Sequence, residues 1–355
     1  MGADTMTELT TYEPSALSRS LAAKDNRLDR IVNIDFGGRG VEHLYEAALK
    51  RQEGWSLVGR AAELLAAVPE KSTVLMTTGS VSRAWISPTI GENDGPAGAA
   101  VIARALALGK RATPIVLAEE TLIPSLGPIF ETAGLTVLPP EKAIEANTGG
   151  TLLAVALVPF TTSDDEAPSA AQQVLEQYKP SLLFSTERVG RNKNGFYYNM
   201  RGINFGQDRA RVDHVFDLAF ERGIPTVAVG DGGNEIGMGN VAEAVAAHIP
   251  HGADGSTACG GGLGATTQVQ ALVTAACSNW GCYAITAALA ARLADPKILH
   301  TPELEAALLR RGVDVGLINS VVGIVDPKVD NIDVSTHLAV VELLSAIIRP
   351  GLSLN

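Results

Sequence analysis

Short runs of apolar and β-branched residues alternate along the chain with longer stretches rich in alanine and leucine. The short runs predict strands and the longer stretches predict helices, because a buried strand needs fewer residues than a helix. The predicted strands are residues 73–78, 113–117, 135–138, 152–158, 181–185, 225–229 and 321–325. The predicted helices are residues 43–67, 97–108, 124–133, 167–177, 208–222, 241–248, 280–294, 302–311 and 336–348.

This alternation predicts an α/β fold, with a mostly parallel sheet covered by helices on both faces in a Rossmann-like three-layer arrangement. The polar, turn-rich segment 161–168 is either a surface loop or a boundary between two halves. Because no long linker is present, we expect a single large unit with elaborations over residues 26–355. Residues 1–25 are expected to form an extended arm that packs on a partner subunit in a homo-oligomer.

Composition narrows the class of protein. With 355 residues, 46% of them hydrophobic and 19% charged, the chain is typical of a globular enzyme. Its net charge of −11 argues against a nucleic-acid partner. No apolar run approaches the roughly 18 residues of a membrane span, and the N-terminus lacks the apolar core of a signal peptide. We therefore expect a cytoplasmic protein, whose three cysteines, without CxxC spacing, are small buried side chains.

One glycine-rich loop stands out. Residues 230–240 (GDGGNEIGMGN) follow the predicted strand 225–229 and contain five glycines among acids and carboxamides. Glycine lets a backbone approach a ligand closely, and ligands of open α/β sheets bind beyond the carboxyl ends of strands. The loop therefore predicts an active site, with a purely structural turn as the alternative. Its candidate site residues are Asp231, Gly232, Gly233, Asn234 and Glu235.

A second polar constellation follows the predicted strand 73–78. It combines residues 77–80 (TTGS) with the acidic turn 91–96 (GENDGP) before the helix predicted at 97–108. Asp94 could simply cap that helix, but Glu92 beside it favours a ligand site, since two such loops can converge on one crevice. The candidate residues here are Thr78, Gly79, Ser80, Glu92 and Asp94.

Two further segments carry polar side chains. From Glu187 to Arg211 six basic residues and two acidic ones follow a predicted strand, which favours a patch that faces a small anion over a solvated loop with surface ion pairs. In residues 277–283 (CSNWGCY), Ser278 or Asn279 could cap the helix at 280–294, or that helix N-terminus could bind an anion. The candidate residues of the basic segment are Glu187, Arg188, Arg191, Tyr198, Asn199 and Arg201.

Familiar cofactor and nucleophile motifs are missing. No Walker A loop, HExxH pair or GxSxG elbow occurs, and the GxGxxA pattern at 237–242 begins too far beyond its strand for a dinucleotide site. The sequence therefore predicts no nucleotide cofactor, and it favours chemistry on a small carboxylate.

In these blocks the sequence resembles the D-glutamate cyclase family, specifically its C-terminal domain, which also occurs as a stand-alone bacterial protein. The similarity rests on GENDGPAGA (91–99), ERVGRNKNGFYYNMRG (187–202), GDGGNEIGMGN (230–240) and SNWGCYA (278–284). It implies a lyase that cyclises D-glutamate, or a close analogue, to 5-oxo-D-proline with loss of water.

This chemistry needs a carboxylate base for the amine and a cation that neutralises the attacked carboxyl. A divalent metal, Mg²⁺ or Mn²⁺, could be held by Asp231 and Glu235, with Glu92 and Asp94 as alternatives. The second carboxylate of a small, amino-acid-like anion could be held by Arg188, Arg191 and Arg201. Tyr198 and Asn199 could add hydrogen bonds. The residues that we expect to take part in catalysis are Glu92, Asp94, Glu187, Tyr198, Asp231 and Glu235.

The sequence departs from the family pattern at several positions. Asn93 stands where a threonine is usual, Asn194 where an aspartate is common, and Gln270 where an acidic residue is expected. These departures leave open a hydrolase or lyase that acts on another small carboxylate, lactam or amide. A protein that binds an acidic metabolite without turnover is the third hypothesis.

Overall fold

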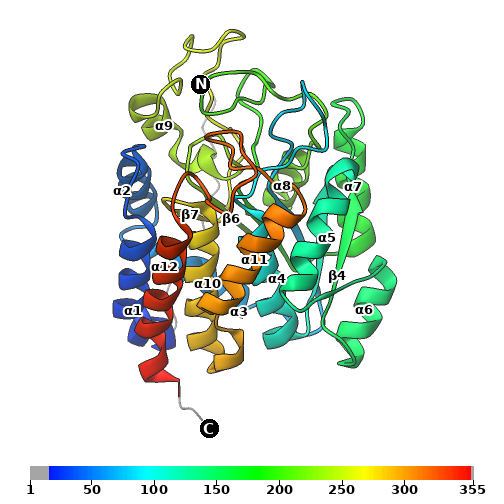
Figure 1. Ribbon diagram of the computed structural model, residues 1–355, viewed down its shortest axis with the longest axis vertical. Helices are drawn as coiled ribbons and strands as arrows, with labels where there is room; N and C mark the ends of the chain where they lie inside the picture. Colours follow the sequence, from blue (N-terminus) through cyan, green and yellow to red (C-terminus); the bar gives the residue numbers. More distant parts are fainter. Residues whose placement is uncertain (1–15, 353–355) are drawn as a thin grey trace, which may run out of the picture.

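The computed structural model describes residues 16–352, and within them seven parallel strands form one sheet, in the order β3-β4-β2-β1-β5-β6-β7. Helices cover both faces of the sheet, which confirms the predicted three-layer α/β fold (Figure 1). The strands are β1 (Thr73–Thr78), β2 (Thr113–Ala118), β3 (Thr136–Val137), β4 (Ala154–Pro159), β5 (Leu182–Thr186), β6 (Thr226–Gly230) and β7 (Ala271–Thr274).

The chain runs outward from the middle of the sheet in two directions. It passes from β1 to its neighbour β2 on one side, and from β5 to β6 and β7 on the other. The strands β1 and β5 themselves pair in register, with Thr78 opposite Thr186. Right-handed crossovers therefore place the helices of the two halves on opposite faces. Ligands of such sheets bind where the direction reverses, here beyond the carboxyl ends of β1 and β5, and we call this place the crevice.

The helices form a close layer on each face. On one face α4 packs along α10, and α12 covers α10 in turn, whereas α7 and α8 pack together on the other face (Figure 1). The helices are α1 (Ala16–Val32), α2 (Val41–Arg51), α3 (Leu57–Ala66), α4 (Pro96–Lys110), α5 (Ile123–Thr132), α6 (Pro140–Gly149), α7 (Ala167–Tyr178), α8 (Asp213–Glu221), α9 (Ala242–His248), α10 (Ser278–Leu293), α11 (Pro302–Asp314) and α12 (Val334–Ile348).

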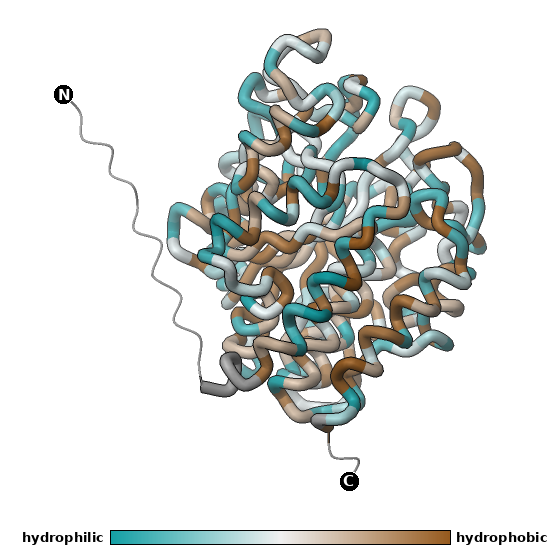
Figure 2. Tube along the Cα trace, turned by 90° about the vertical axis from the view of Figure 1, so that its left-hand side faces the viewer, coloured by the Kyte–Doolittle hydropathy of each residue, from teal (hydrophilic) through white to brown (hydrophobic). Residues whose placement is uncertain are grey.

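The helix α10 is the central helix of the fold. Its residues are buried without interruption from Ser278 to Ala290, as expected for a helix that is apolar on all sides. A side chain at Gly98 of α4 would lie 2.9 Å from Cys282 Sγ, so glycine allows the two helices to approach closely. Hydrophobic residues run through the centre of the molecule, and hydrophilic ones lie mainly at its periphery (Figure 2). No helix in residues 16–352 combines the length and apolar character that a bilayer span requires.

Six of the seven predicted strands form, with shifts of one or two residues at their ends. The prediction of a strand at 321–325 is wrong, because this segment is an exposed loop closed by a bridge between Asn319 and Ile324. The prediction missed β7, whose four residues are too short a run to stand out from their surroundings.

The helices differ from the prediction at four places. Residues 43–67 form two helices, α2 and α3, because the chain turns at Gly54 (φ 83°) and Ser56 caps α3 by accepting from Gly59 N–H. The helix predicted at 208–222 begins only at Asp213, and α6 was not predicted. Residues 16–25, expected in an extended arm, belong to α1, where Asp25 forms an ion pair with Arg292 of α10 at 2.8 Å. The rest of the expected arm, residues 1–15, lies outside the described part of the chain.

Candidate active site

Three carboxylates meet at the crevice between β1 and β5. Glu187 directly follows β5, Asp231 directly follows β6, and Asp94 ends the loop between β1 and α4. One oxygen from each of the three lies within 4.8 Å of the other two. The chain therefore brings together acids that lie up to 137 positions apart (231 − 94) at the carboxyl ends of neighbouring strands. The sequence-predicted residues Asp94, Glu187 and Asp231 share one site.

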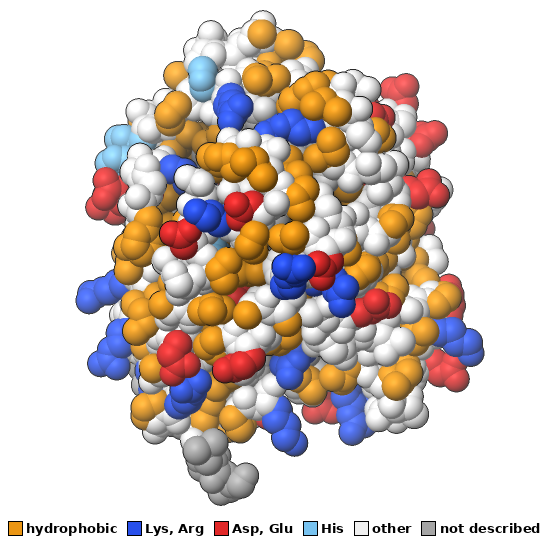
Figure 3. Space-filling model, in the orientation of Figure 1, with side chains coloured by type: hydrophobic (Ala, Val, Ile, Leu, Met, Phe, Trp, Pro, Cys, Tyr) orange, Lys and Arg blue, Asp and Glu red, His pale blue; other side chains and the backbone are white. Residues whose placement is uncertain are grey.

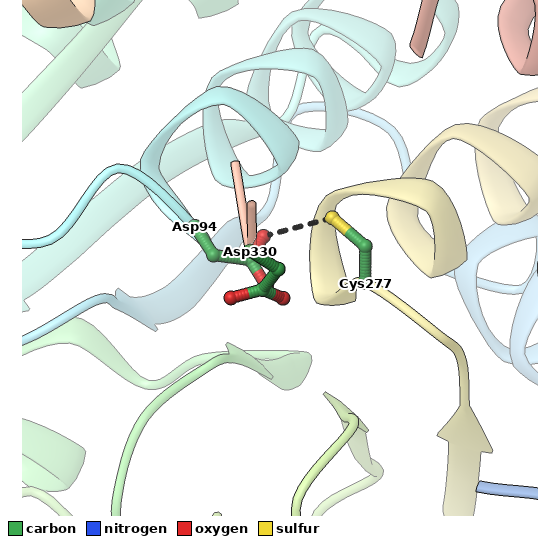
Figure 4. Close-up of side chains that lie close together, drawn as sticks. All are labelled: Asp94, Cys277 and Asp330. Atoms are coloured by element: carbon green, nitrogen blue, oxygen red, sulfur yellow. Dashed lines mark hydrogen bonds between the residues drawn. The ribbon is translucent and has the colours of Figure 1, made fainter. Parts of the chain in front are cut away.

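A fourth carboxylate, Asp330, reaches the same place from the loop between α11 and α12. Atoms of Asp94, Cys277 and Asp330 also lie within 4.8 Å of one another, and Figure 4 shows the two carboxylates side by side, with that of Asp94 bonded to the Cys277 thiol. Cys277 Sγ donates to Asp94 Oδ1 at 3.4 Å, and burial raises the pKa of this thiol, which favours the protonated donor.

Asp94 joins the N-termini of two helices. Its carboxylate accepts from the backbone N–H of Ser278 at 2.9 Å and of Asn279 at 3.0 Å, in the first turn of α10. The Asn279 side chain accepts in return from Gly95 N at 3.1 Å and from Gly98 N at 2.7 Å, at the start of α4. Asp94 therefore does not cap its own helix α4, and neither Ser278 nor Asn279 caps α10. Burial, and next the charge of Asp231, raise the pKa of Asp94 to about 6.

Glu187 has an uncommon backbone conformation. Its φ of 54° is unfavourable for a residue with a side chain, and such strain concentrates at functional sites. Ser278 Oγ donates to its Oε2 at 2.6 Å, and its N–H donates to Val229 O at 3.1 Å. Burial, and next the charge of Asp231, raise the pKa of Glu187 well above its usual value. The acidic cluster thus includes a glutamate whose backbone is held in an unfavourable conformation.

Glu92 lies beside this cluster, on the loop that follows β1. Its Oε1 accepts from Ser80 Oγ at 3.0 Å, and its backbone forms a bridge with Ile318. Burial raises the pKa of Glu92 to about 7, and the charge of Arg209 opposes this effect. Ser80 and Glu92, from the same connection between β1 and α4, are thus in contact beside the cluster.

Arg39 is a site residue that the sequence analysis missed. Its Nη2 lies 2.7 Å from Asp231 Oδ2 and 3.4 Å from Asp330 Oδ2, and it donates to Ala276 O. Arg39 belongs to the loop between α1 and α2, which does not follow a strand and matches none of the motifs considered. Asp330, in the loop between α11 and α12, is a second site residue that the sequence analysis missed.

Glu235 serves its own loop. Its two oxygens accept from the N–H groups of Asp231, Gly232 and Gly233 at 3.0, 2.7 and 2.7 Å. The N–H groups of Gly232 and Gly233, which we expected to face a ligand, are therefore already bonded. The backbone of Gly233 has a φ of 107°, a conformation that favours glycine. Among the described residues, Glu235 belongs to neither group of close ligand atoms. We therefore conclude that Glu235 stabilises the conformation of this loop.

Two predicted substrate arginines have carboxylate partners elsewhere. Arg188 is fully buried and forms two hydrogen bonds with Glu119, at 2.7 and 2.8 Å. Arg191 pairs with Asp213 at 2.7 Å and with Asp217, in a different hollow that His214 also lines. The charges of both are neutralised by the protein itself, so we leave them out of the proposed substrate site.

The remaining predicted residues mostly support loops. Tyr198 is buried, and its hydroxyl accepts from Cys259 N at 3.0 Å, while Asn234 donates to its carbonyl at 2.7 Å. Asn199 accepts from Arg201 N and Ile203 N at 2.9 and 3.1 Å. These contacts give Tyr198, Asn199 and Asn234 a structural role.

Thr78 and Gly79 lie at the end of β1, within the crevice. Gly79 O accepts from Arg188 Nη1 at 3.1 Å. The Thr78 hydroxyl is buried and finds no partner among the described residues. A side chain at Gly95 would lie 2.8 Å from Glu187 Cβ and 2.9 Å from Thr78 Oγ1, so this turn must pass very close to the crevice.

The charges in the crevice are unbalanced. Its carboxylates are Glu92, Asp94, Glu187, Asp231 and Asp330, and only Arg39 pairs with any of them within the described chain. Mutual repulsion contributes to the raised pKa values of all the acids whose pKa is shifted here. A divalent cation or the ammonium group of a substrate would relieve this repulsion.

Comparisons with known proteins show which family the chain belongs to. A family model described as D-glutamate cyclase-like, C-terminal, matches residues 28–345. The chain is also 30% identical over 301 residues to the Homo sapiens protein named D-glutamate cyclase, mitochondrial, an alignment that covers 84% of this chain and 43% of that protein. The chain thus spans less than half the length of this relative. It belongs to the D-glutamate cyclase-like family.

Proposed function

We propose that the protein is a metal-assisted lyase that converts D-glutamate, or a close analogue, to 5-oxo-D-proline and water. The observation that carries the proposal is the trio Asp94, Glu187 and Asp231, whose oxygens meet at the crevice. The choice of D-glutamate rests on the family and on the name of the human relative.

The trio suits a hard divalent cation. Three carboxylate oxygens are the donors that Mg²⁺ and Mn²⁺ prefer, whereas the neighbouring Cys277 offers a protonated sulfur. When bound, such an ion offsets the charge of a carboxylate and makes its carbon more electrophilic. Asp94, Glu187 and Asp231 are therefore our proposed ligands, and Glu235 is no longer among them.

The other groups suit the proton transfers that cyclisation requires. The α-ammonium of glutamate must lose a proton before its nitrogen attacks the side-chain carboxyl carbon. A C–N bond then forms, a C–O bond breaks, and the departing oxygen leaves as water after it takes up protons. Glu92 lies next to the trio, bonded to Ser80. In this proposal it accepts the two protons that the nitrogen loses, one before and one after the attack, and passes each to the departing oxygen.

The departures from the family pattern do not favour another reaction. Gln270 precedes β7 and its N–H bonds to Thr226, which begins β6, so it lies at the opposite end of the sheet. Asn194 is exposed and donates to Cys259 O, while Asn93 donates to Asp326 O and Lys328 O. These contacts hold loops, so the family reaction remains the better-supported proposal.

Incubation of the purified protein with D-glutamate and Mn²⁺, followed by chiral mass spectrometry, tests this function. We expect 5-oxo-D-proline to form, and Asp231→Asn to lower the rate at least about a hundredfold, the usual scale for a group that stabilises charge in a transition state. Asp254→Asn is the matched control, since its exposed carboxylate contacts Lys193 and the N–H of Gly261 at the surface, away from the crevice. Binding of D-glutamate without any product, or equal rates for both variants, contradicts the proposal.

A further inference from the structure

Three loops meet above the acidic crevice, and each is closed by an isolated β-bridge. The bridges join Val81 to Gly91, Tyr198 to Asn204, and Asn319 to Ile324. The first and third loops are also joined to each other, because Glu92 forms a bridge with Ile318 and Asn93 N donates to Ile318 O at 3.0 Å. This rim is therefore built from defined turns and stands directly beside Glu92.

Two arginines from different loops converge on the third. Arg83 Nη2 donates to Ser320 O at 2.7 Å, and Arg201 Nη2 donates to Val321 O at 2.8 Å. Their acceptors are carbonyls of consecutive residues, so the two positive groups are brought near each other. Neither guanidinium forms an ion pair with a carboxylate among residues 16–352, in contrast to Arg39, Arg188 and Arg191.

The two charges affect each other. Burial first, and then the charge of Arg201, lower the pKa of Arg83, while Glu92 opposes this. The surroundings are apolar, because Trp85, Met200 and Val322 are exposed on the same three loops. Figure 3 shows hydrophobic and Lys or Arg side chains interleaved over the loops at the upper end of the molecule. A ligand that covers this rim would exclude water and strengthen its attraction to the arginines.

We propose that Arg83 and Arg201 form the subsite for the substrate carboxylate that does not react. Two adjacent guanidiniums without a carboxylate of their own provide the donors and the charge that an anion needs. The acidic crevice would bind the ammonium and the metal, and the rim would bind the free carboxylate, so the substrate would lie between opposite charges. This inference depends on the proposed function for the identity of the ligand and not for the location of the subsite.

Calorimetry with two closely related ligands tests the subsite. We expect the protein to bind 5-oxo-D-proline at least about tenfold more tightly than its neutral carboxamide, and Arg83→Ala and Arg201→Ala each to weaken 5-oxo-D-proline binding by roughly 10- to 100-fold. Binding of the carboxamide should hardly change, and Arg83→Lys should retain part of the preference. Arg104→Ala is the matched control, because Arg104 also donates to a backbone carbonyl, that of Lys297, further along α4.

The outcomes separate this inference from the proposed function. Glutarate, a simple dicarboxylate that cannot cyclise, is titrated in parallel. If D-glutamate is not converted but glutarate binding requires both arginines, the proposed function fails and the subsite stands. If D-glutamate is converted with an unchanged KM in both variants, the subsite is wrong and the function stands. The subsite is also wrong if variants with a normal melting temperature lose affinity for 5-oxo-D-proline and for its carboxamide equally. It is wrong as well if the unmodified protein binds none of these ligands.

Discussion

Arg39 Nη2 lies 2.7 Å from Asp231 Oδ2, and this contact joins the loop between α1 and α2 to the carboxyl end of β6. The two residues are 192 positions apart in the chain. Arg39 is about one-third exposed, whereas Asp231 is almost fully buried. The guanidinium is therefore the internal cation that partly neutralises the proposed metal-binding carboxylates, and it competes with a metal for Asp231.

Replacing Arg39 with alanine should have opposite effects in the absence and presence of metal. Without metal, Asp231 loses its partner, and we expect the melting temperature to fall by a few degrees, as for a loss of about 1 kcal/mol from a partly exposed pair. With Mn²⁺, the rise in melting temperature should be larger in Arg39→Ala than in the unmodified protein, because no guanidinium competes. Thermal melts with and without Mn²⁺ measure both effects, and a smaller Mn²⁺-induced rise in the variant is incompatible with this competition.

Removal of divalent metal should abolish lactam formation. We expect dialysis against a chelator to inactivate the protein, and Mn²⁺ or Mg²⁺ to restore the activity. Glu187→Gln should weaken Mn²⁺ binding at least about tenfold, since even groups that only orient a metal ligand contribute that much. Titration calorimetry and elemental analysis check this, with Glu42→Gln, an exposed acid on α2, as the control. Full activity in a preparation shown to be free of metal would rule out a metal role.

The sequence predicted the acids that follow strands and missed the groups that come from elsewhere. Glu187 and Asp231 could be placed because each directly follows a run of buried strand residues, and the carboxyl ends of parallel strands share one edge. Arg39 and Asp330 lie in loops between helices, and no periodic pattern indicates which crevice such a loop approaches. Their position depends on how α1, α11 and α12 pack, which is a tertiary property.

The sequence also cannot show where a polar side chain points. Glu235 and Asp231 occupy the same glycine-rich loop, yet Glu235 bonds to backbone N–H groups of that loop while Asp231 faces the crevice. Arg188 has the residue type and position of a substrate ligand, but Glu119, from the loop after β2, occupies its guanidinium. The exposed run 321–325 matches a strand in composition and is instead a loop, because it has no neighbouring strand with which to pair.

Asn279 should matter more for stability than its neutral side chain suggests. Its Oδ1 accepts from two buried N–H groups, those of Gly95 and Gly98, and joins α10 to α4. Asn279→Ala leaves the buried N–H of Gly98 without an acceptor, whereas the N–H of Gly95 keeps its bond to Asp94 Oδ1 at 2.9 Å. We therefore expect a loss of about 1–3 kcal/mol in the free energy of unfolding, together with lower activity. Denaturant unfolding measures the loss. Asn204→Ala is the control, since its exposed amide accepts only from Gly206 N and should cost within about 0.5 kcal/mol.

A variant of Arg188 can show whether this residue stabilises the fold or binds the substrate. Its guanidinium is fully buried between Glu119 and the carbonyls of Gly79 and Ala210. Arg188→Met leaves Glu119 as a buried, unpaired acid, and we expect a loss of about 3–5 kcal/mol in the free energy of unfolding. The double variant with Glu119→Gln should recover part of that loss. If Arg188→Met instead unfolds like the unmodified protein and only raises KM, Arg188 contacts substrate after all.

His337 should make the stability of the protein depend on pH. Its Nδ1 accepts from Trp280 Nε1 at 2.8 Å, in the first turn of α10, which requires this nitrogen to be unprotonated. Burial lowers the pKa of His337 below its usual 6.5, although Glu305, with an oxygen 4.0 Å away, opposes the effect. The folded state thus binds fewer protons than the unfolded state. The stability that neutral His337 contributes is fully present above about pH 6.5. This contribution is lost as the pH falls toward the lowered pKa.

For this one proton, the free energy of unfolding should fall by up to about 1.4 kcal/mol for each pH unit. Denaturant unfolding between pH 5 and pH 8 measures the slope. His337→Gln should reduce the slope, because glutamine cannot take up a proton, even if the variant is less stable at every pH. His251→Gln, at an exposed histidine, is the matched control for loss of an imidazole. An identical slope in His337→Gln and the unmodified protein would mean that other groups govern the acid sensitivity of the fold.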